Sequence, residues 1–222
     1  MLLTSLLSLL APHECLGCSA EGALLCATCR GGLSPAIERC YECHEATIGG
    51  RTCPNCLACT PLYAVRAATK YEGTAKDLLW KLKFGRARAA ADEIGAMLAR
   101  TTARRDMSGA IVTHIPTATN RVRQRGYDQA RLIAKAFAQT KSAQYTPLLR
   151  RSGNVKQVGA SRSVRTAQLA NVFRPIHTEH IRNAHIILVD DVVTTGATLA
   201  TAAEILRDAG ARRVEAVVFA QA

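Results

Sequence analysis

The sequence predicts an α/β fold, in which a mostly parallel β-sheet is flanked by helices and preceded by a small cysteine-rich module. Three observations support this prediction. Beyond residue 62, short apolar runs typical of strands alternate with segments of helical periodicity. All nine cysteines lie between Cys15 and Cys59. The apolar run at residues 186–189 leads directly into Asp190 and Asp191, and a threonine-rich turn follows.

The composition is that of a globular protein with a basic surface. Of the 222 residues, 48% are apolar and 21% are charged, which suffices for a core and argues against a disordered chain. The formal net charge of +12 indicates a negatively charged partner, a nucleic acid or a phosphorylated small molecule, unless it only makes the surface soluble. No apolar run approaches the ~20 residues that cross a bilayer, so we expect no transmembrane helix and a cytoplasmic location.

Residues 1–12 contain six leucines whose spacing fits a short amphipathic helix, predicted to pack on the domain that follows. A signal peptide would need a positive residue before the leucines, and the sequence has none there. Membrane export is therefore the less favoured interpretation of this segment.

The cysteines form four Cys-x-x-Cys pairs, a strong indication of metal binding. The pairs are Cys15/Cys18, Cys26/Cys29, Cys40/Cys43 and Cys53/Cys56. Two thiolates at this spacing can both reach one tetrahedral zinc ion, at about 2.3 Å. Four pairs supply ligands for two zinc ions, although one zinc with some pairs unused also fits. Because this segment has few large apolar residues, metal binding would fold it, and we expect a structural role for zinc.

Other functions of the cysteines are less favoured than metal binding, and the way in which the pairs combine is left open by the sequence. Disulfides would require an oxidising compartment, yet the rest of the chain has no cysteine and no convincing export signal. A thioredoxin-like role would require one pair at a helix start. Neighbouring pairs could close together, or the pairs could interleave. Cys59 forms a further Cys-x-x-Cys with Cys56, so the fourth pair could be shifted, while His44 is interpreted as a bystander.

The remaining elements are predicted in chain order. We expect an edge strand at residues 65–71, two helices within residues 74–100 divided at Gly85, a strand at 110–116, a helix at 127–138 and a strand near 145–149. Residues 150–169 are polar and basic, which predicts a long functional or mobile loop. A strand at 184–191, a helix at 197–209 closed by Gly210 and a final strand at 212–220 complete the pattern.

The strand that ends in Asp190 and Asp191 is the strongest candidate for a site. Ligands of open parallel sheets bind beyond the carboxyl ends of the strands, where paired carboxylates can bind hydroxyls or Mg²⁺. The following turn consists of Thr194, Thr195, Gly196, Ala197 and Thr198. Its N–H groups, hydroxyls and the helix behind it suit a phosphate, and its glycine allows close approach. A sugar phosphate matches both parts, whereas a helix cap and an ordinary turn would explain only some of these residues.

This stretch resembles the phosphoribosyl-pyrophosphate signature of type I phosphoribosyltransferases: four hydrophobic residues, two acidic residues and Thr-Thr-Gly-x-Thr. The match is complete across residues 186–198. Further motifs are similar to the ComF family of competence-related proteins: "LKF" at 82–84, "RVRQRGYDQA" at 121–130, "LLRR" and "QVGASRSVR" within 148–165, "NVF" at 171–173, and the four cysteine pairs. Cys59 lies outside the usual eight, which leaves the fourth pair in doubt.

The resemblance implies a pentosyl-transferring glycosyltransferase that binds phosphoribosyl pyrophosphate with Mg²⁺, in the setting of DNA uptake and natural transformation. A nucleophile would displace pyrophosphate at the anomeric carbon through an oxocarbenium-like state. Asp190 and Asp191 would hold the ribose hydroxyls and stabilise the developing charge. Residues 194–198 would hold the 5′-phosphate. The acceptor is not specified by the sequence.

The pyrophosphate would need positive partners, and residues 119–182 contain thirteen lysines and arginines. Residues 117–126 occupy the place of a pyrophosphate loop, and residues 150–165 that of a mobile lid. The candidates are Lys83, Arg121, Arg123, Arg125, Lys156, Arg162 and Arg165. Any one of them could be a solvated surface charge, but the density of the set favours a role in binding.

The predicted organisation is an N-terminal helix at residues 1–12, a zinc-binding module at 13–62 and a phosphoribosyltransferase-like domain at 63–222. Two other functions are compatible with it. The chain could be a non-catalytic competence factor that binds single-stranded DNA with other DNA-uptake proteins, although aromatic residues for base stacking make up only 5%. It could also be a regulator that senses phosphoribosyl pyrophosphate without turning it over.

Overall fold

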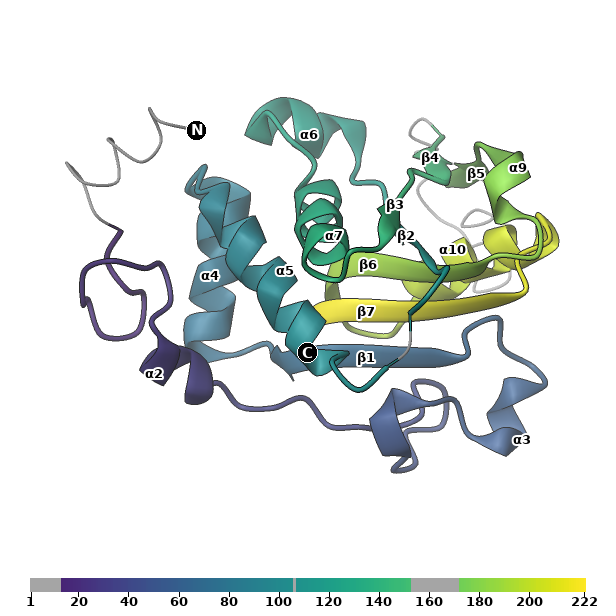
Figure 1. The fold of residues 1–222 in the computed structure, drawn as a ribbon, viewed down its shortest axis with the longest axis horizontal. Coiled ribbons are helices and arrows are strands. Elements are labelled where there is room, and N and C mark those ends of the chain that lie inside the picture. The colour runs from purple at the N-terminus through teal and green to yellow at the C-terminus, as the bar shows by residue number, and fades with distance from the viewer. Residues whose placement is uncertain (1–12, 106, 153–171) are drawn as a thin grey trace, which may run out of the picture.

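The computed structural model describes residues 13–105, 107–152 and 172–222 (Figure 1). Its centre is a five-stranded sheet with the order β1-β7-β6-β2-β3, and every neighbouring pair of strands is parallel. The strands are β1 (Ala64–Lys70), β2 (Ile111–His114), β3 (Gln144–Tyr145), β6 (His185–Val193) and β7 (Arg213–Gln221). The predicted parallel α/β fold is confirmed.

Helices cover both faces of this sheet. The helices α4 (Gly73–Phe84), α5 (Ala89–Thr101) and α7 (Gln129–Thr140) pack on one face, and α10 (Ala197–Asp208) packs on the other (Figure 1). Successive side chains of a strand point to opposite faces, so Ile187 and Val189 of β6 join the first core, while Ile186 and Leu188 join the second. Burial on both faces explains why the strand is continuously apolar.

Two predicted segments differ from the structure. The strand expected near residues 145–149 is divided into β3 and β4 (Leu149–Arg151), because Pro147 has no N–H with which to continue the ladder. β4 pairs instead with β5 (Phe173–Pro175) in a small antiparallel sheet, near the short helix α9 (Thr178–Ile181). The segment expected to be a pyrophosphate loop contains the helix α6 (Thr119–Arg125), which Gly126 ends in a left-handed conformation.

The cysteine-rich segment runs along the outer edge of β1 (Figure 1). It contains only the short helices α2 (Ala27–Gly31), η1 (Ile48–Gly50) and α3 (Pro54–Leu57). The backbone of Ser34 accepts hydrogen bonds from the Lys70 N–H and the Thr69 hydroxyl, at 2.9 and 2.7 Å. The segment therefore covers a strand edge that would otherwise invite pairing with another chain.

Two predictions concern chain segments and membranes. The helix predicted at residues 1–12 and most of the predicted loop at 150–169 lie outside the described residues. Across the described part of the chain, none of the helices has both the length and the apolar character required to cross a membrane.

Candidate functional site

The candidate site lies where the order of the strands reverses. From β2 the chain continues to β3 on one side of the sheet, and from β6 it continues to β7 on the other. In open parallel sheets the crevice at such a point, beyond the carboxyl ends of the strands, is the usual ligand site. Asp190 and Asp191 lie near the end of β6, next to the end of β2 at His114.

The two aspartates are unequally compensated. The Asp191 carboxylate is 8% exposed, and its Oδ2 lies 3.0 Å from Lys83 Nζ and 3.3 Å from Gln129 Nε2. The Asp190 Oδ1 accepts the Asp191 N–H at 2.8 Å, and this side chain is half-buried. Burial and the negative charge of Asp191 raise the pKa of Asp190 well above its usual value, against the smaller effect of Lys83. Among the described residues, one lysine is ion-paired to this pair of carboxylates.

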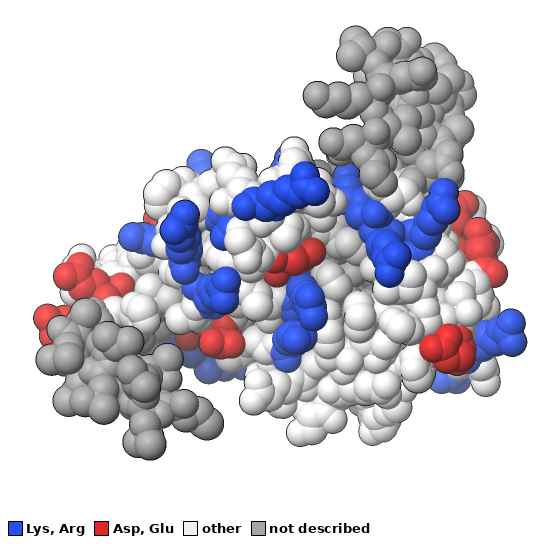
Figure 2. Space-filling model, turned by 90° about the horizontal axis from the view of Figure 1, so that it is seen from above, with Lys and Arg blue, Asp and Glu red and all other residues white. Residues whose placement is uncertain are grey.

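Three arginines surround the aspartates. Arg125 Nη1 donates to Gln129 Oε1 at 2.8 Å, and Gln129 in turn donates to Asp191. Burial and the charge of Arg121 lower the pKa of both Arg125 and Arg151, while the charge of Asp190 acts on Arg151 in the opposite direction. These effects place Arg121, Arg125 and Arg151 in one electrostatic neighbourhood. Figure 2, which views the molecule from the side of α6, shows lysine and arginine side chains around a smaller number of acidic ones.

The threonine-rich turn after β6 leads directly into α10. Thr194, Thr195 and Thr198 are exposed, and Gly196 is the N-cap of the helix with a φ of 75°. A Cβ at Gly196 would lie 3.1 Å from the ring of Tyr41, so the close packing and the positive φ both require glycine. The Thr195 hydroxyl accepts the Ala197 N–H at 3.4 Å. The turn thus presents hydroxyls and a helix N-terminus, a combination suited to an oxyanion.

The predicted cations differ in where they lie relative to the two aspartates. Lys83 and Arg125 lie in the immediate surroundings of Asp191, and Arg121 lies near Arg125. Arg123 is exposed on α6 and makes no ion pair with a described residue. The remaining candidates, Lys156, Arg162 and Arg165, lie outside the described residues.

Sequence reasoning assigned no role to Asp128, Gln129, Arg151 or Tyr41. Asp128 and Gln129 belong to the motif "RGYDQA", which was a readable signal without an assigned chemistry. Asp128 accepts the N–H and the hydroxyl of Thr117, both at 2.9 Å, and so fixes the chain after β2. Arg151 belongs to the motif "LLRR" and to the predicted lid, but it was not named among the candidate cations. For Tyr41 the sequence contains no comparable signal, because its contact depends on the tertiary fold.

The eight paired cysteines form two separate clusters. The sulfur atoms of Cys15, Cys18, Cys26 and Cys29 lie within 4.8 Å of one another, as do those of Cys40, Cys43, Cys53 and Cys56. Neighbouring pairs therefore close together, and the interleaved alternative is wrong. Each cluster is able to bind zinc, since four thiolates are the donor set of closed tetrahedral zinc sites.

Local backbone geometry supports a metal at the first cluster. The N–H groups of Cys26 and Gly17 bond to the sulfur of Cys15 and lower its pKa to about 6, which favours the thiolate that a metal requires. The neighbouring thiols of the cluster raise the pKa of Cys29 to about 12, as expected when four sulfur atoms crowd together without a cation. Cys59 and His44 belong to neither cluster, and the Cys59 S–H donates to the Cys56 carbonyl at 3.3 Å. The fourth pair is therefore Cys53/Cys56 and not Cys56/Cys59.

Comparison with known proteins defines first a class and then a narrower likeness. Residues 128–222 match the family model of the phosphoribosyl transferase domain, so this part of the chain is similar to domains of that class. The chain is also similar to "DNA utilization protein YhgH" of Escherichia coli, 27% identical over 221 residues that cover 93% of this chain and 96% of that protein. It is 27% identical to "Competence protein ComFC" of Bacillus subtilis over 210 residues, covering 80% and 81%. The resemblance to the ComF family is confirmed.

Solved structures of phosphoribosyltransferases are more distant. An allosteric regulatory enzyme of purine biosynthesis is 20% identical with a TM-score of 0.45, over 59% of this chain and 25% of that one. The match therefore spans about a quarter of that enzyme. An adenine phosphoribosyltransferase from Thermoanaerobacter pseudethanolicus is 14% identical with a TM-score of 0.40, over 62% and 83% of the two chains.

Proposed function

We propose that the chain binds phosphoribosyl pyrophosphate with Mg²⁺ at the end of β6 and transfers its phosphoribosyl group to an acceptor. The observation that carries this proposal is the pair Asp190 and Asp191, which lies among basic side chains and next to an exposed threonine turn at a helix N-terminus. One buried and one half-buried carboxylate, with one ion-paired lysine among the described residues, favour a ligand that brings hydroxyls and a cation. The names of the relatives support a setting in the use or uptake of DNA.

The roles follow from where each group lies. The ribose hydroxyls bond to Asp190 and Asp191, and the 5′-phosphate bonds to residues 194–198. A lone pair of the acceptor forms a bond to the anomeric carbon, while the bond from this carbon to the pyrophosphate oxygen breaks and the leaving group takes its electron pair. Positive charge develops on the sugar ring beside the carboxylates, which stabilises the transition state more than the ground state.

Cations near the aspartates hold the leaving group. Of the four predicted candidates that the structure describes, Lys83, Arg121 and Arg125 take this role, while Arg123 is exposed away from them. Arg151 joins the three because it lies in the same electrostatic neighbourhood. A bound Mg²⁺ would neutralise part of the pyrophosphate charge. Because Lys83 is paired with Asp191 before the ligand arrives, a ribose hydroxyl would replace this contact and free the lysine for the pyrophosphate.

The remaining parts of the chain have supporting roles in this proposal. Residues 13–62 form a structural module with two zinc ions, and residues 63–222 form the phosphoribosyltransferase domain. The chain acts in the cytoplasm, where phosphoribosyl pyrophosphate would be available. The module adjoins the active domain through the contact between Tyr41 and Gly196.

Two measurements test the proposal. Isothermal titration with phosphoribosyl pyrophosphate and Mg²⁺ should give saturable binding, and pyrophosphate release should follow when nucleobase or amine acceptors are added. Binding without release from any acceptor would favour a sensor of the same ligand. Failure to bind in the presence of Mg²⁺ would contradict the site itself.

Binding of single-stranded DNA is a second candidate, favoured by the net charge of +12 and by the names of the relatives. Contacts to phosphates release counterions, so the affinity should fall steeply as salt rises. A gel-shift series across salt concentrations measures this slope. Absence of a shift even at low salt would end this candidate.

A further inference from the structure

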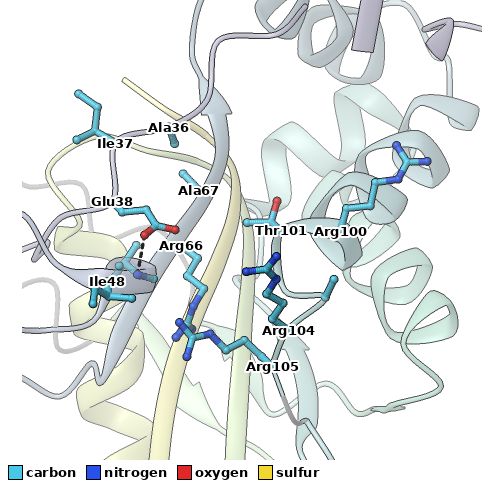
Figure 3. A pocket seen from close by; sticks show the side chains of 14 residues that line it. Ala36, Ile37, Glu38, Ile48, Arg66, Ala67, Arg100, Thr101, Arg104 and Arg105 are labelled. Atoms are coloured by element: carbon cyan, nitrogen blue, oxygen red, sulfur yellow. Dashed lines mark hydrogen bonds between the residues drawn. The ribbon is translucent and has the colours of Figure 1, made fainter. Parts of the chain in front are cut away.

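A cavity of about 380 Å³ lies away from the candidate site, between the cysteine-rich segment, β1 and the end of α5 (Figure 3). Its volume is within the range of small-ligand pockets, ~300–1,000 Å³, and near the lower limit. None of the residues that line it belongs to the candidate site at Asp190 and Asp191. Its polar side chains are consequently available for a different ligand.

Arginines dominate the polar lining. Figure 3 shows Arg66, Arg104 and Arg105 extending toward the cavity, whereas Arg100 turns away. Arg66 is 5% exposed and pairs with Glu215 through Nη1, but its buried Nε has no hydrogen-bond partner within the described part of the chain. Arg104 and Arg105 make no ion pair with any described residue. Basic residues stabilise a helix C-terminus when they lie in its last turn. Arg104 and Arg105 lie beyond the end of α5 at Thr101, so this role does not explain them.

Apolar side chains and one carboxylate complete the lining. Ile48 and Ile37, which both line the cavity, are 86% and 57% exposed. Exposing so much apolar surface to water is unfavourable in free energy, and a ligand that covered it would gain that free energy. Glu38 Oε2 accepts the Gly49 N–H at 2.7 Å, and its Oε1 makes no hydrogen bond with a described residue. The cavity therefore offers cations, an apolar wall and a hydrogen-bond acceptor.

The backbone of the cysteine-rich segment is shaped to keep this space. Gly49 and Gly50 both have positive φ, 66° and 61°. A Cβ at Gly49 would lie 1.9 Å from Arg105 Nη2, and a Cβ at Gly50 would lie 2.2 Å from the Val65 carbonyl oxygen. Two glycines thus bring the segment against β1 and give the Arg105 guanidinium its position.

We propose that this cavity binds a nucleoside monophosphate. Arg104 and Arg105 hold the phosphate, because guanidinium groups match phosphate oxygens in charge and geometry. The base lies against Ile37 and Ile48. Glu38 accepts a hydrogen bond from an exocyclic amine or a ribose hydroxyl. The modest volume favours one phosphate over a longer chain of phosphates.

The test uses the full-length, zinc-loaded chain carrying Asp191→Asn, so that a sugar phosphate at β6 does not contribute. Isothermal titration with AMP, GMP, CMP and UMP should reveal one saturable site for at least one of them. On this background Arg105→Ala should weaken binding by at least about tenfold, because a charge-assisted contact to the phosphate is lost. Arg105→Lys should weaken it less, and Ile48→Ser should weaken it about fivefold.

Matched controls separate the cavity from general charge and stability. Arg212→Ala removes an exposed arginine outside the cavity, and Leu57→Ser removes an exposed apolar side chain of the same segment. Both should bind the nucleotide as the parent does. Melting curves and zinc content establish that Arg105→Ala is folded, and Arg105→Lys repeats the test if it is not.

Three results would overturn the proposal. The first is no monophosphate binding tighter than about 1 mM. The second is equal affinity for inorganic phosphate, which would remove any role for the base. The third is binding that requires a longer oligonucleotide, or that Arg105→Ala and Ile48→Ser leave unchanged.

Discussion

At its amino end β6 places His185 beside the buried carboxylate of Glu215, and at its carboxyl end the same strand contributes Asp190 and Asp191. Glu215, on the adjacent strand β7, pairs with Arg66 and Arg213 and lies 3.2 Å from His185 Nε2. At the other end, one ion-paired lysine faces two carboxylates among the described residues. One strand therefore joins a carboxylate with three close basic partners to a pair of carboxylates with one ion pair among the described residues.

The pKa values of the two ends move in opposite directions. Burial alone would raise the pKa of Glu215, but the hydrogen bond from His185 and the charges of Arg66 and Arg213 outweigh it and lower the pKa to about 2. Burial and Asp191 instead raise the pKa of Asp190. A low carboxylate pKa that the protein's own cations produce indicates a role in the fold, whereas a raised carboxylate pKa at the carboxyl end of a central strand is typical of a ligand site.

The largest effect is expected from Asp191→Asn. It should weaken the binding of phosphoribosyl pyrophosphate at least about 100-fold, because a charged hydrogen-bond acceptor for the ribose is lost. The melting temperature should stay the same or rise, since a like charge beside Asp190 is removed. Titration calorimetry and thermal melts measure the two quantities. A large loss of stability with intact binding would mean that Asp191 serves the fold and not the ligand.

Glu215→Gln should give the opposite pattern. Removing this carboxylate leaves Arg66 buried without its partner, and the pKa shift corresponds to about 3 kcal/mol at neutral pH. Denaturant unfolding should show a loss of this order, while the affinity for phosphoribosyl pyrophosphate stays within about twofold. An affinity loss as large as that of Asp191→Asn would mean that the two ends are not independent.

The pH dependence of stability and of ligand binding should also distinguish the two ends of β6. Because the folded pKa of Glu215 is depressed, its contribution is fully present above its ordinary value of 4.5 and is lost as the pH falls toward about 2. Acid unfolding of the parent should show this loss, and Glu215→Gln should not.

For Asp190 the sign is reversed. Its raised pKa favours the neutral carboxyl in the folded chain, so this group's contribution to stability declines as the pH rises from 3.8 through the raised pKa. Ligand binding should strengthen over the same interval, because it uses the carboxylate. Lys83→Met removes a charge that lowers this pKa, so the midpoint of the binding profile should move to higher pH. A midpoint that stays in place would argue against Asp190 as the titrating group.

The smallest effects on binding are expected from substitutions of two arginines of α6, Arg125 and Arg123. Arg125→Ala should weaken binding about tenfold, because Arg125 is linked to Asp191 through Gln129. Arg123→Ala should change it less than about twofold, as expected for an exposed charge. Both variants lose one positive charge, so equal effects would show that only the overall field matters.

The two ends also differ in how far the sequence could predict them. Asp190, Asp191 and the threonine turn are contiguous, so a local pattern was enough to propose them. The cluster around Glu215 unites residues of three strands, and Arg66 lies 149 positions away from its partner. No local pattern contains that information, because only the strand order brings these side chains together.

Other differences have local causes. The spacing of the cysteines allowed neighbouring or interleaved clusters, and only the path of the chain along β1 decides between them. The interruption at Pro147 was readable, since proline has no N–H to donate and often ends a strand. α6 has no buried residue, so the hydrophobic periodicity that predicted the larger helices had nothing to detect there.

The register of β6 has a consequence for the evolution of its gene. Insertion or deletion of one codon between His185 and Asp190 would turn the intervening aliphatic side chains to the opposite face. It would also displace either the histidine or the aspartates by one position. Substitutions that keep the alternation can accumulate within this stretch, but its length is constrained from both termini at once.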